Sequence, residues 1–198
     1  MTTAAETTSE PRSKRLKSLT REVHEHLDNS IMSMATFASL EGYVPFLKVQ
    51  YLFHLTVDPL YREERLKALL PDLPARRRLP LASADLADLA IDRPDAGPPV
   101  FVPGGAVDVP TALGWCYVAE GSTMGAALLR KEAAKLGLSD DFGARHLAPA
   151  PEGPAPHWRA FVAALDTVEL DAEEEDRVTQ GAVAAFAHVQ ALVDAAQA

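Results

Sequence analysis

The sequence predicts a single all-α domain of medium size. Alanine and leucine dominate the composition, and runs of β-branched residues are scarce, which favours helices over strands. A chain of 198 residues is long enough to enclose one continuous hydrophobic core. The sequence shows neither an internal repeat nor a boundary between two cores. We therefore assign residues 12–198 to one compact domain, and the short, threonine-rich residues 1–11 to a disordered tail.

Charge, hydropathy and cysteine content narrow the class of protein. A formal net charge of −9 argues against nucleic acid as a partner, because phosphate binding favours a basic surface. The polar, acidic N-terminus is not a secretory signal, and no apolar run approaches the roughly 18 residues of a membrane span. The only cysteine, Cys116, suits a reducing compartment and is expected to be a small buried hydrophobe. We expect a soluble, cytoplasmic, monomeric protein.

Two long helices are predicted near the N-terminus. From Ser13 onward, apolar residues recur at spacings of three and four residues, and a second helix should start near Ser39 and run to about Leu60. Pro45 should lie in the first turn of the second helix, and Pro59 should kink or end it. Residues 61–70 should continue as helix. The predicted core stripe of the first helix is Leu16, Leu19, Val23, Leu27 and Ile31.

The centre of the chain contains the longest predicted helix. Residues 71–110 hold eight of the fifteen prolines, which predicts loops and short helices, one of them at 82–89. Asp108 marks the start of a helix over 111–136, which Gly137 should end. Twenty-six residues would span roughly 39 Å, enough to cross a domain.

The C-terminal part should contain two more helices. Residues 149–156 form a proline-rich loop, and a short amphipathic helix follows at 158–165. Asp171 and Glu174 have the spacing of a capping box, which predicts the start of the last helix. The predicted core side of that helix consists of Val178, Phe186, Val189 and Val193.

Gly121 and Gly125 interrupt the longest predicted helix. Each glycine costs roughly 1 kcal/mol relative to alanine in a helix interior, so the missing side chains need a compensating role. Glu120 and Arg130 bound the segment too closely for a membrane helix. On the motif alone, tight packing against another helix is the favoured interpretation. The alternative is close approach of the backbone to a flat ligand.

His24 is the candidate metal ligand. On a continuous helix it shares one edge with Asp28, one turn further on, and with Lys17, about two turns or roughly 10.5 Å earlier. Asp28 would orient the imidazole, and the offset of Lys17 suits the distance between a haem iron and its propionates. The alternatives are a histidine that is simply satisfied in the core and an ordinary exposed lysine.

Several other polar residues are ambiguous from sequence. Taken alone, each of these residues is explained equally well as a helix cap, a surface charge or part of the core. The arginine run at 76–78 is expected to be exposed to solvent. The set is His54, Arg76, Arg77, Arg78, Tyr117, His146 and Trp158.

Taken in order, the blocks around these residues closely resemble bacterial haem oxygenases of the branch found in Gram-negative pathogens and beside bacteriophytochromes. The resemblance covers about residues 13–195. No single block is specific, but the ordered set is. The blocks are residues 15–24 (RLKSLTREVH), 53–54 with Tyr61, 114–115, 119–122 with 125–127, 143–148 and 157–161.

The resemblance implies a fold in which haem is sandwiched between a proximal and a distal helix. His24 matches the proximal iron ligand. Gly121 and Gly125 match the distal helix that leaves space for iron-bound oxygen. The remaining matches are Lys17 and Tyr117 to propionate contacts, Ser122 to the haem-contacting distal segment, and His54, Arg78 and Trp158 to supports of an ordered water network.

The resemblance also implies the reaction and its partners. Haem would be both cofactor and substrate, cleaved with dioxygen to biliverdin, carbon monoxide and ferrous iron. The predicted electron donor is a ferredoxin or a flavoprotein reductase, docking on a basic surface that includes Lys14, Arg15 and Arg21. A bacteriophytochrome or another biliverdin acceptor is a further expected partner, and iron acquisition and chromophore supply both stay open as roles.

The site residues also predict which isomer forms. Lys17, Met32, Tyr117 and Glu132 occupy the places at which one subgroup of the resembling family turns its haem with asparagine and lysines, and this predicts the α-isomer of biliverdin. Two alternatives to the enzyme are a haem-binding carrier or sensor without turnover, and a haem-free helical interaction module.

Overall fold

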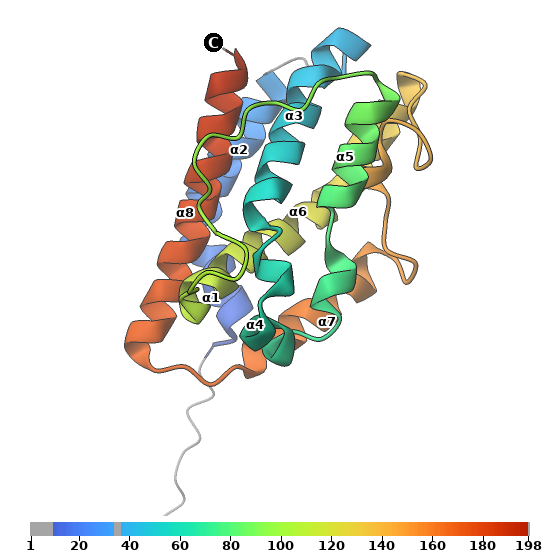
Figure 1. Ribbon diagram of the computed structural model, residues 1–198. Helices are drawn as coiled ribbons and strands as arrows, with labels where there is room; N and C mark the ends of the chain where they lie inside the picture. The colour runs from blue at the N-terminus through green and yellow to red at the C-terminus, as the bar shows by residue number, and fades with distance from the viewer. Residues whose placement is uncertain (1–9, 34–36, 198) are drawn as a thin grey trace, which may run out of the picture.

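The computed structural model of the chain describes residues 10–33 and 37–197 and is all-α, as predicted. Most of the predicted tail, residues 1–9, lies outside the described residues. Figure 1 shows the helices gathered into one bundle. The elements of the described ranges are α1 (Arg12–Leu19), α2 (Arg21–Ser33), α3 (Leu40–Val57), η1 (Leu60–Arg62), α4 (Glu64–Leu69), η2 (Leu73–Arg76), α5 (Leu79–Asp88), α6 (Val109–Lys135), η3 (Arg145–Leu147), α7 (Pro154–Thr167) and α8 (Ala172–Gln197), where η marks a 3₁₀ segment.

Helix α6 is central to the packing. Its most extensive contact is with α8, and it also contacts α3, α4, α7 and η3. In Figure 1 it passes behind α3 and α5, while α8 runs beside α3 on the left. The long segment between α5 and α6 crosses the front of the bundle (Figure 1). None of the described helices is long and apolar enough to cross a membrane.

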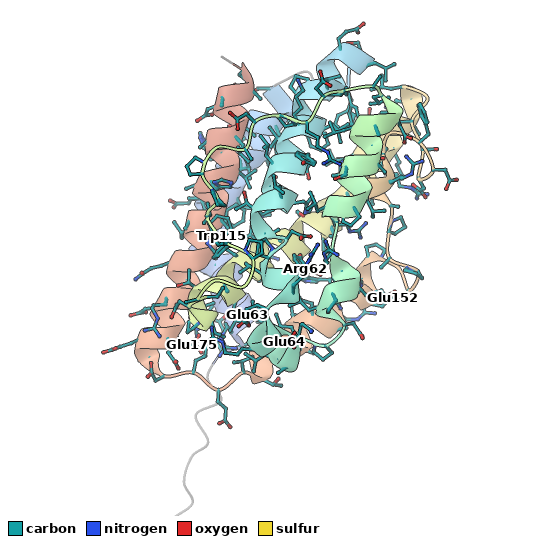
Figure 2. All side chains as sticks on the ribbon, in the orientation of Figure 1. Arg62, Glu63, Glu64, Trp115, Glu152 and Glu175 are labelled. Atoms are coloured by element: carbon teal, nitrogen blue, oxygen red, sulfur yellow. The ribbon has the colours of Figure 1, made fainter. Side chains whose placement is uncertain are left out.

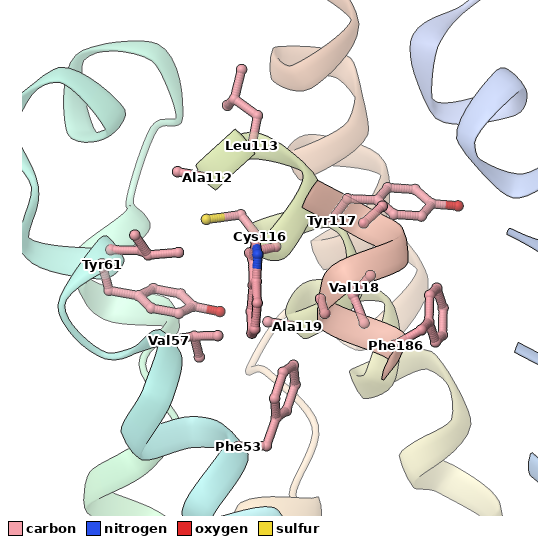
Figure 3. Packing of buried hydrophobic residues seen from close by; sticks show 14 of the residues in the cluster. Phe53, Val57, Tyr61, Ala112, Leu113, Cys116, Tyr117, Val118, Ala119 and Phe186 are labelled. Atoms are coloured by element: carbon pink, nitrogen blue, oxygen red, sulfur yellow. The ribbon is translucent and has the colours of Figure 1, made fainter. Parts of the chain in front are cut away.

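The main core lies around the first half of α6. Figure 3 shows Cys116 and Ala112 facing Tyr61 and Val57, and the predicted burial of Cys116 is confirmed. Tyr117 and Phe186 point away from that group, toward another side of the bundle (Figure 3). The predicted core residues of the last helix are all buried: Val178, Phe186, Val189 and Val193.

The first predicted helix is in fact two helices. The helix breaks at Thr20, whose backbone (φ −101°, ψ 4°) caps α1 and whose hydroxyl donates to the Leu16 carbonyl. Leu16 is buried in α1, and Leu27 is the buried residue of α2, but Leu19 and Val23 are exposed. The prediction of one continuous core stripe was therefore wrong, because two of its apolar residues face outward.

The second predicted helix is correct in position but ends earlier. Ser39 caps it by accepting from the Gly42 amide, and the helix ends at Val57, two residues before Pro59. Pro45 lies inside the helix rather than in its first turn, since the helix begins at Leu40. The segment predicted as one helix over 61–70 is divided between η1 and α4, because Glu63 adopts an extended backbone and caps α4.

The predicted start and stop signals of the later helices are confirmed. Asp108 accepts from the Thr111 amide at 3.0 Å at the start of α6, and Gly137 follows its end with φ +82°. Asp171 and Glu174 form the predicted reciprocal capping box, at 2.8 and 3.0 Å. The short predicted helices are longer than expected: α5 starts three residues before Ala82, and α7 begins within the proline-rich loop.

Candidate functional site

The burial of helix α6 changes abruptly at the Glu120–Gly121 bond. Residues 112–120 are all buried, whereas residues 121–130 are all exposed or half-buried. Met124 is 41% exposed and Leu128 is 61% exposed, although both are apolar. The second half of α6 therefore presents a face to which nothing else in the described chain is packed closely.

Neither Gly121 nor Gly125 is required by helix packing. Among residues 10–33 and 37–197, a Cβ atom added at Gly125 would meet nothing within 4 Å, and one at Gly121 would make only an ordinary contact, 3.6 Å from the Trp158 ring. The interpretation that the motif alone favoured, tight helix–helix packing, is therefore wrong. The two glycines keep an exposed helix face free of side chains.

His24 lies on the exposed side of α2. Its side chain is 60% exposed, and its ring centroid lies 5.2 Å from that of Phe186 on α8. Asp28 Oδ2 lies 3.5 Å from His24 Nε2, as the spacing of one turn predicted. The alternative of a satisfied core histidine is wrong, because the imidazole is accessible to a ligand.

A basic hollow brings Lys17 and His24 together despite the break at Thr20. Its volume is about 410 Å³. Three cationic side chains and one carboxylate border it, so it favours an anionic group. The hollow is lined by Lys14, Lys17, Ser18, Arg21, His24 and Glu25.

Tyr117 and Trp158 lie together beside Gly121. Their ring centroids are 5.6 Å apart, and Trp158 also stacks on Phe161. Burial raises the pKa of the Tyr117 hydroxyl, and the Asp166 carboxylate raises it further, so Tyr117 is a neutral hydrogen-bond donor. Ser122, one residue beyond Gly121, is exposed, and its hydroxyl donates to the Ala119 carbonyl at 2.7 Å.

His54 and Arg78 are buried in the interior. Burial, followed by the positive potentials of His146 and Arg78, lowers the pKa of His54 to about 3, so its ring is neutral at physiological pH. Arg78 donates to the carbonyls of Ala148 (2.6 Å) and His146 (3.4 Å), and burial lowers its pKa. These two residues are thus close enough to influence each other electrostatically.

The arginine run is not solvated, contrary to the prediction. Arg76 is buried and donates to Glu120 Oε2 at 2.8 Å, while Arg77 donates to Asp58 at 2.7 Å. Tyr61 donates to the other Glu120 oxygen, also at 2.8 Å. Glu120 is therefore the centre of a buried polar network that sequence reasoning missed, because its partners are distant in the chain.

His146 belongs to a second buried network. Asp85, which is fully buried, accepts from the backbone amides of Arg145 and His146 and from His146 Nδ1, at 2.8–2.9 Å. His146 Nε2 is buried and has no hydrogen-bond partner among the residues that the structure describes. Such a nitrogen fits an internal water, which would bridge it to other buried polar groups.

Comparison with known proteins gives a consistent assignment. A family model described as "Heme oxygenase" matches residues 105–195. The heme oxygenase PigA of Pseudomonas aeruginosa is 45% identical over 175 residues, which are 88% of this chain and 87% of the relative. The chain therefore belongs to the haem oxygenase family, whose members bind haem as both cofactor and substrate.

Solved structures support the same fold. The haem oxygenase of Neisseria meningitidis, known in NO- and CO-bound forms, superposes with a TM-score of 0.87 at 40% identity. The match covers 95% of this chain and 92% of the other. Haem oxygenase 2 of Chlamydomonas reinhardtii shares the fold alone, with a TM-score of 0.72 at 19% identity over 94% of this chain and 97% of the other. The protein is accordingly an enzyme of the haem oxygenase type that degrades haem.

The site residues fit haem. An exposed imidazole suits iron, a basic hollow suits two carboxylates, and a helix face without side chains suits close approach of a planar ring. The fit depends most on one observation: no atom of the described part of the chain lies within 4 Å of the Gly125 Cβ position.

Proposed function

We propose that the exposed half of α6 and the His24 side of α2 hold haem, and that the reaction yields the α-isomer of biliverdin, with carbon monoxide and ferrous iron. The observation that carries the proposal is the bare, exposed face at Gly125 in a chain whose His24 is also exposed. Bound haem would supply the iron that activates dioxygen and the porphyrin carbon that is oxidised.

Each side chain has a defined task in this proposal. His24 binds the iron, and Asp28 orients its ring. Lys17 pairs with a propionate, since it borders the basic hollow next to His24. Tyr117 donates its hydroxyl to a propionate, because burial keeps it protonated. These contacts would fix the rotation of the ring and thereby the carbon that is attacked.

On the α6 side of the proposed haem site, the functional feature is the absence of side chains at Gly121 and Gly125. Side chains at Gly121 and Gly125 would occupy the place of the oxygen, so glycine is required there, and Ser122 lies on the same segment. His54 is neutral and Arg78 is tied to two carbonyls, so neither is a strong acid near the reaction. Together with Trp158 they would support waters that deliver protons gently.

Electrons would come from a ferredoxin or a flavoprotein reductase. Lys14 and Arg21 border the basic hollow and are free to meet an acidic donor, whereas Arg15 is paired with Glu175. Lys14→Gln with Arg21→Gln should slow turnover at limiting donor and much less at saturating donor, and haemin affinity is measured alongside because both residues also border the hollow. Lys135→Gln, at the far end of α6, is the matched control, and an equal effect there would contradict the docking surface.

The activity itself is tested with purified protein and haemin. We expect one-to-one binding, and conversion to a green bilin when reductant is added in air. A stable haem spectrum without bilin would favour a carrier or sensor instead. His24→Ala should change both the spectrum and the affinity; if neither changes, the chain does not hold haem through this residue.

The isomer, the acceptor and the compartment need separate measurements. Chromatography and mass of the product should identify the α-isomer, and a predominant δ-isomer would contradict the proposed haem rotation. We also propose a cytoplasmic location and transfer of biliverdin to an acceptor such as a bacteriophytochrome. Genomic neighbours and cell fractionation test these two proposals.

A further inference from the structure

His157 lies between an exposed carboxylate and a buried one. Its Nδ1 donates to Glu152 Oε1 at 2.7 Å, and its Nε2 lies 3.6 Å from Glu120 Oε2. The side chain of Glu152 is 50% exposed, that of His157 is 10% exposed and that of Glu120 is 2% exposed. Figure 2 shows Glu152 at the outer edge of the molecule, on the segment that leads to α7. The three side chains therefore form a graded path from solvent into the interior.

The inner end of this path is next to the glycine segment. Glu120 directly precedes Gly121 in α6, and the residue after His157 is Trp158, whose ring is the nearest side chain to the Gly121 Cβ position. Beyond Glu120, Tyr61 donates to its second oxygen. The path thus reaches the buried side of the segment without placing an acid on its bare face.

The charges around His157 are compatible with proton transfer. Hydrogen bonding from His157 is the largest cause of the lowered pKa of Glu152, so Glu152 is an ionised acceptor. Arg76 faces the group from η2, pairing with Glu120 and donating to the His157 carbonyl at 3.3 Å. Arg78 and Tyr61 lie further in and sense the charge of Glu120.

We propose that His157, held in place by Glu152, and Glu120 relay protons from solvent to the interior side of the Gly121–Gly125 segment. This inference rests on the proposed function, because reduction of dioxygen during haem cleavage takes up protons. His157 is a relay residue rather than a catalytic one, since it acts through Glu120 and the polar groups beyond it.

Each cycle of the relay moves one proton. The protonated ring gives its Nε2 proton to Glu120 Oε2 and becomes neutral, with its other proton still on the Glu152 side. The ring then turns about its Cβ–Cγ bond, its bare Nε2 takes a proton from water near Glu152, and the ring turns back so that the Nε2 proton again faces Glu120 and Nδ1 again donates to Glu152. Glu120 passes its proton inward and returns to the carboxylate. The net change is one proton moved from solvent to the interior, and a histidine suits this task near neutral pH.

The first experiment uses haem-free protein. After a rapid drop in pH, infrared spectroscopy follows the carbonyl band of protonated Glu120, which Glu120→Gln identifies by removing it. We expect His157→Gln to slow the appearance of this band about tenfold or more. His188→Gln, a half-buried histidine of α8 beside Thr56, is the matched control and should leave the rate unchanged. An unchanged rate in His157→Gln would overturn the relay.

The second experiment measures turnover. Glu152→Gln and His157→Gln should slow bilin formation about tenfold at pH 8 and less at pH 6, with unchanged haemin affinity. Glu173→Gln, an exposed glutamate at the start of α8, is the control for Glu152. Normal turnover in both variants would contradict the relay, even if the infrared rate were slowed. If the wild-type protein formed no bilin, the proposed function would fail, while the infrared rates would still test the path.

Discussion

The two halves of α6 use glycine for opposite purposes. In the first half, Gly114 lies against α8 so closely that an added Cβ would be 2.5 Å from the Ala182 nitrogen and closer still to the Val178 carbonyl oxygen. Gly181 on α8 meets α6 in the same way, at 2.9 Å from the Thr111 carbonyl carbon. In the second half, a Cβ added at Gly125 would have no atom of the described residues within 4 Å. One glycine lets two helices touch, and the other keeps a surface open.

The two halves of α6 show that a single helix can be both a packed scaffold and a binding surface. Its first half is buried on every side and is fixed by the core and by the Glu120 network. Its second half contributes few buried side chains, so its position depends on the rigid half before it. A ligand site built on such a segment is positioned by packing that lies one or two turns away.

The largest effect should come from Gly114→Ala. The new methyl group would overlap the backbone of α8, which cannot move without separating the two helices. We expect a loss of at least about 3 kcal/mol in the free energy of unfolding, despite the better helix propensity of alanine. Urea denaturation followed by circular dichroism measures it.

Gly181→Ala is the independent check from the other side of the same contact. It should destabilise the protein to a similar extent, because its methyl group would overlap the Thr111 backbone. Unchanged urea midpoints in both variants would show that the two helices are not in close contact.

The second effect concerns His54, which belongs to the buried region. Its pKa is lowered from 6.5 to about 3, first by burial. Below pH 6.5, His54 binds a proton in the unfolded chain but stays neutral in the folded protein. Its contribution to the free energy of unfolding therefore falls as the pH decreases toward 3. The slope should approach about 1.4 kcal/mol for each pH unit.

The test is to measure the free energy of unfolding between pH 6.5 and pH 3 in the wild-type protein and in His54→Gln. The variant should show a shallower loss of stability between pH 6 and pH 4. The exposed His24 offers a comparison, and His24→Gln should leave the slope closer to that of the wild-type protein. Equal slopes in all three proteins would mean that His54 is not buried in neutral form.

Local signals were sufficient for most of the fold. Caps at Asp108 and Asp171 and the glycine after α6 are side-chain and backbone effects within a few residues, so the sequence predicts them well. Lys17 and His24 border one hollow even though the helix breaks between them at Thr20. Boundaries were less accurate where a capping residue, such as Glu63, divided a helical stretch.

Long-range contacts could not be predicted in the same way. Whether an arginine is solvated depends on its partner, and Arg76 is separated from Glu120 by 44 residues. The same holds for the glycines, because only the position of α8 distinguishes Gly114 from Gly125. Composition and periodicity contain no information about these partners.

The third effect should appear in function rather than in folding. Gly125→Leu places a large side chain on the open face, where the haem-free protein has room for it. We expect bilin formation to fall about tenfold or more, because misplacement of about 1 Å at a reacting centre has effects of that size or larger. Ala134→Leu, an exposed position in the last turns of α6, is the control and should keep wild-type turnover. Equal activity of the two variants would show that the open face is not used.

The smallest effect is also the sharpest test of the contrast between the two halves. In the haem-free protein, Gly125→Ala adds a methyl group that meets nothing within 4 Å and replaces glycine in a helix interior. Alanine loses less conformational freedom on folding, so the variant should be more stable by about 0.5–1 kcal/mol. The same substitution at Gly114 should destabilise the protein, so the two variants should shift the urea midpoint in opposite directions. A glycine whose replacement stabilises the fold is retained for what its surface binds, and a shared sign for the two variants would remove that argument.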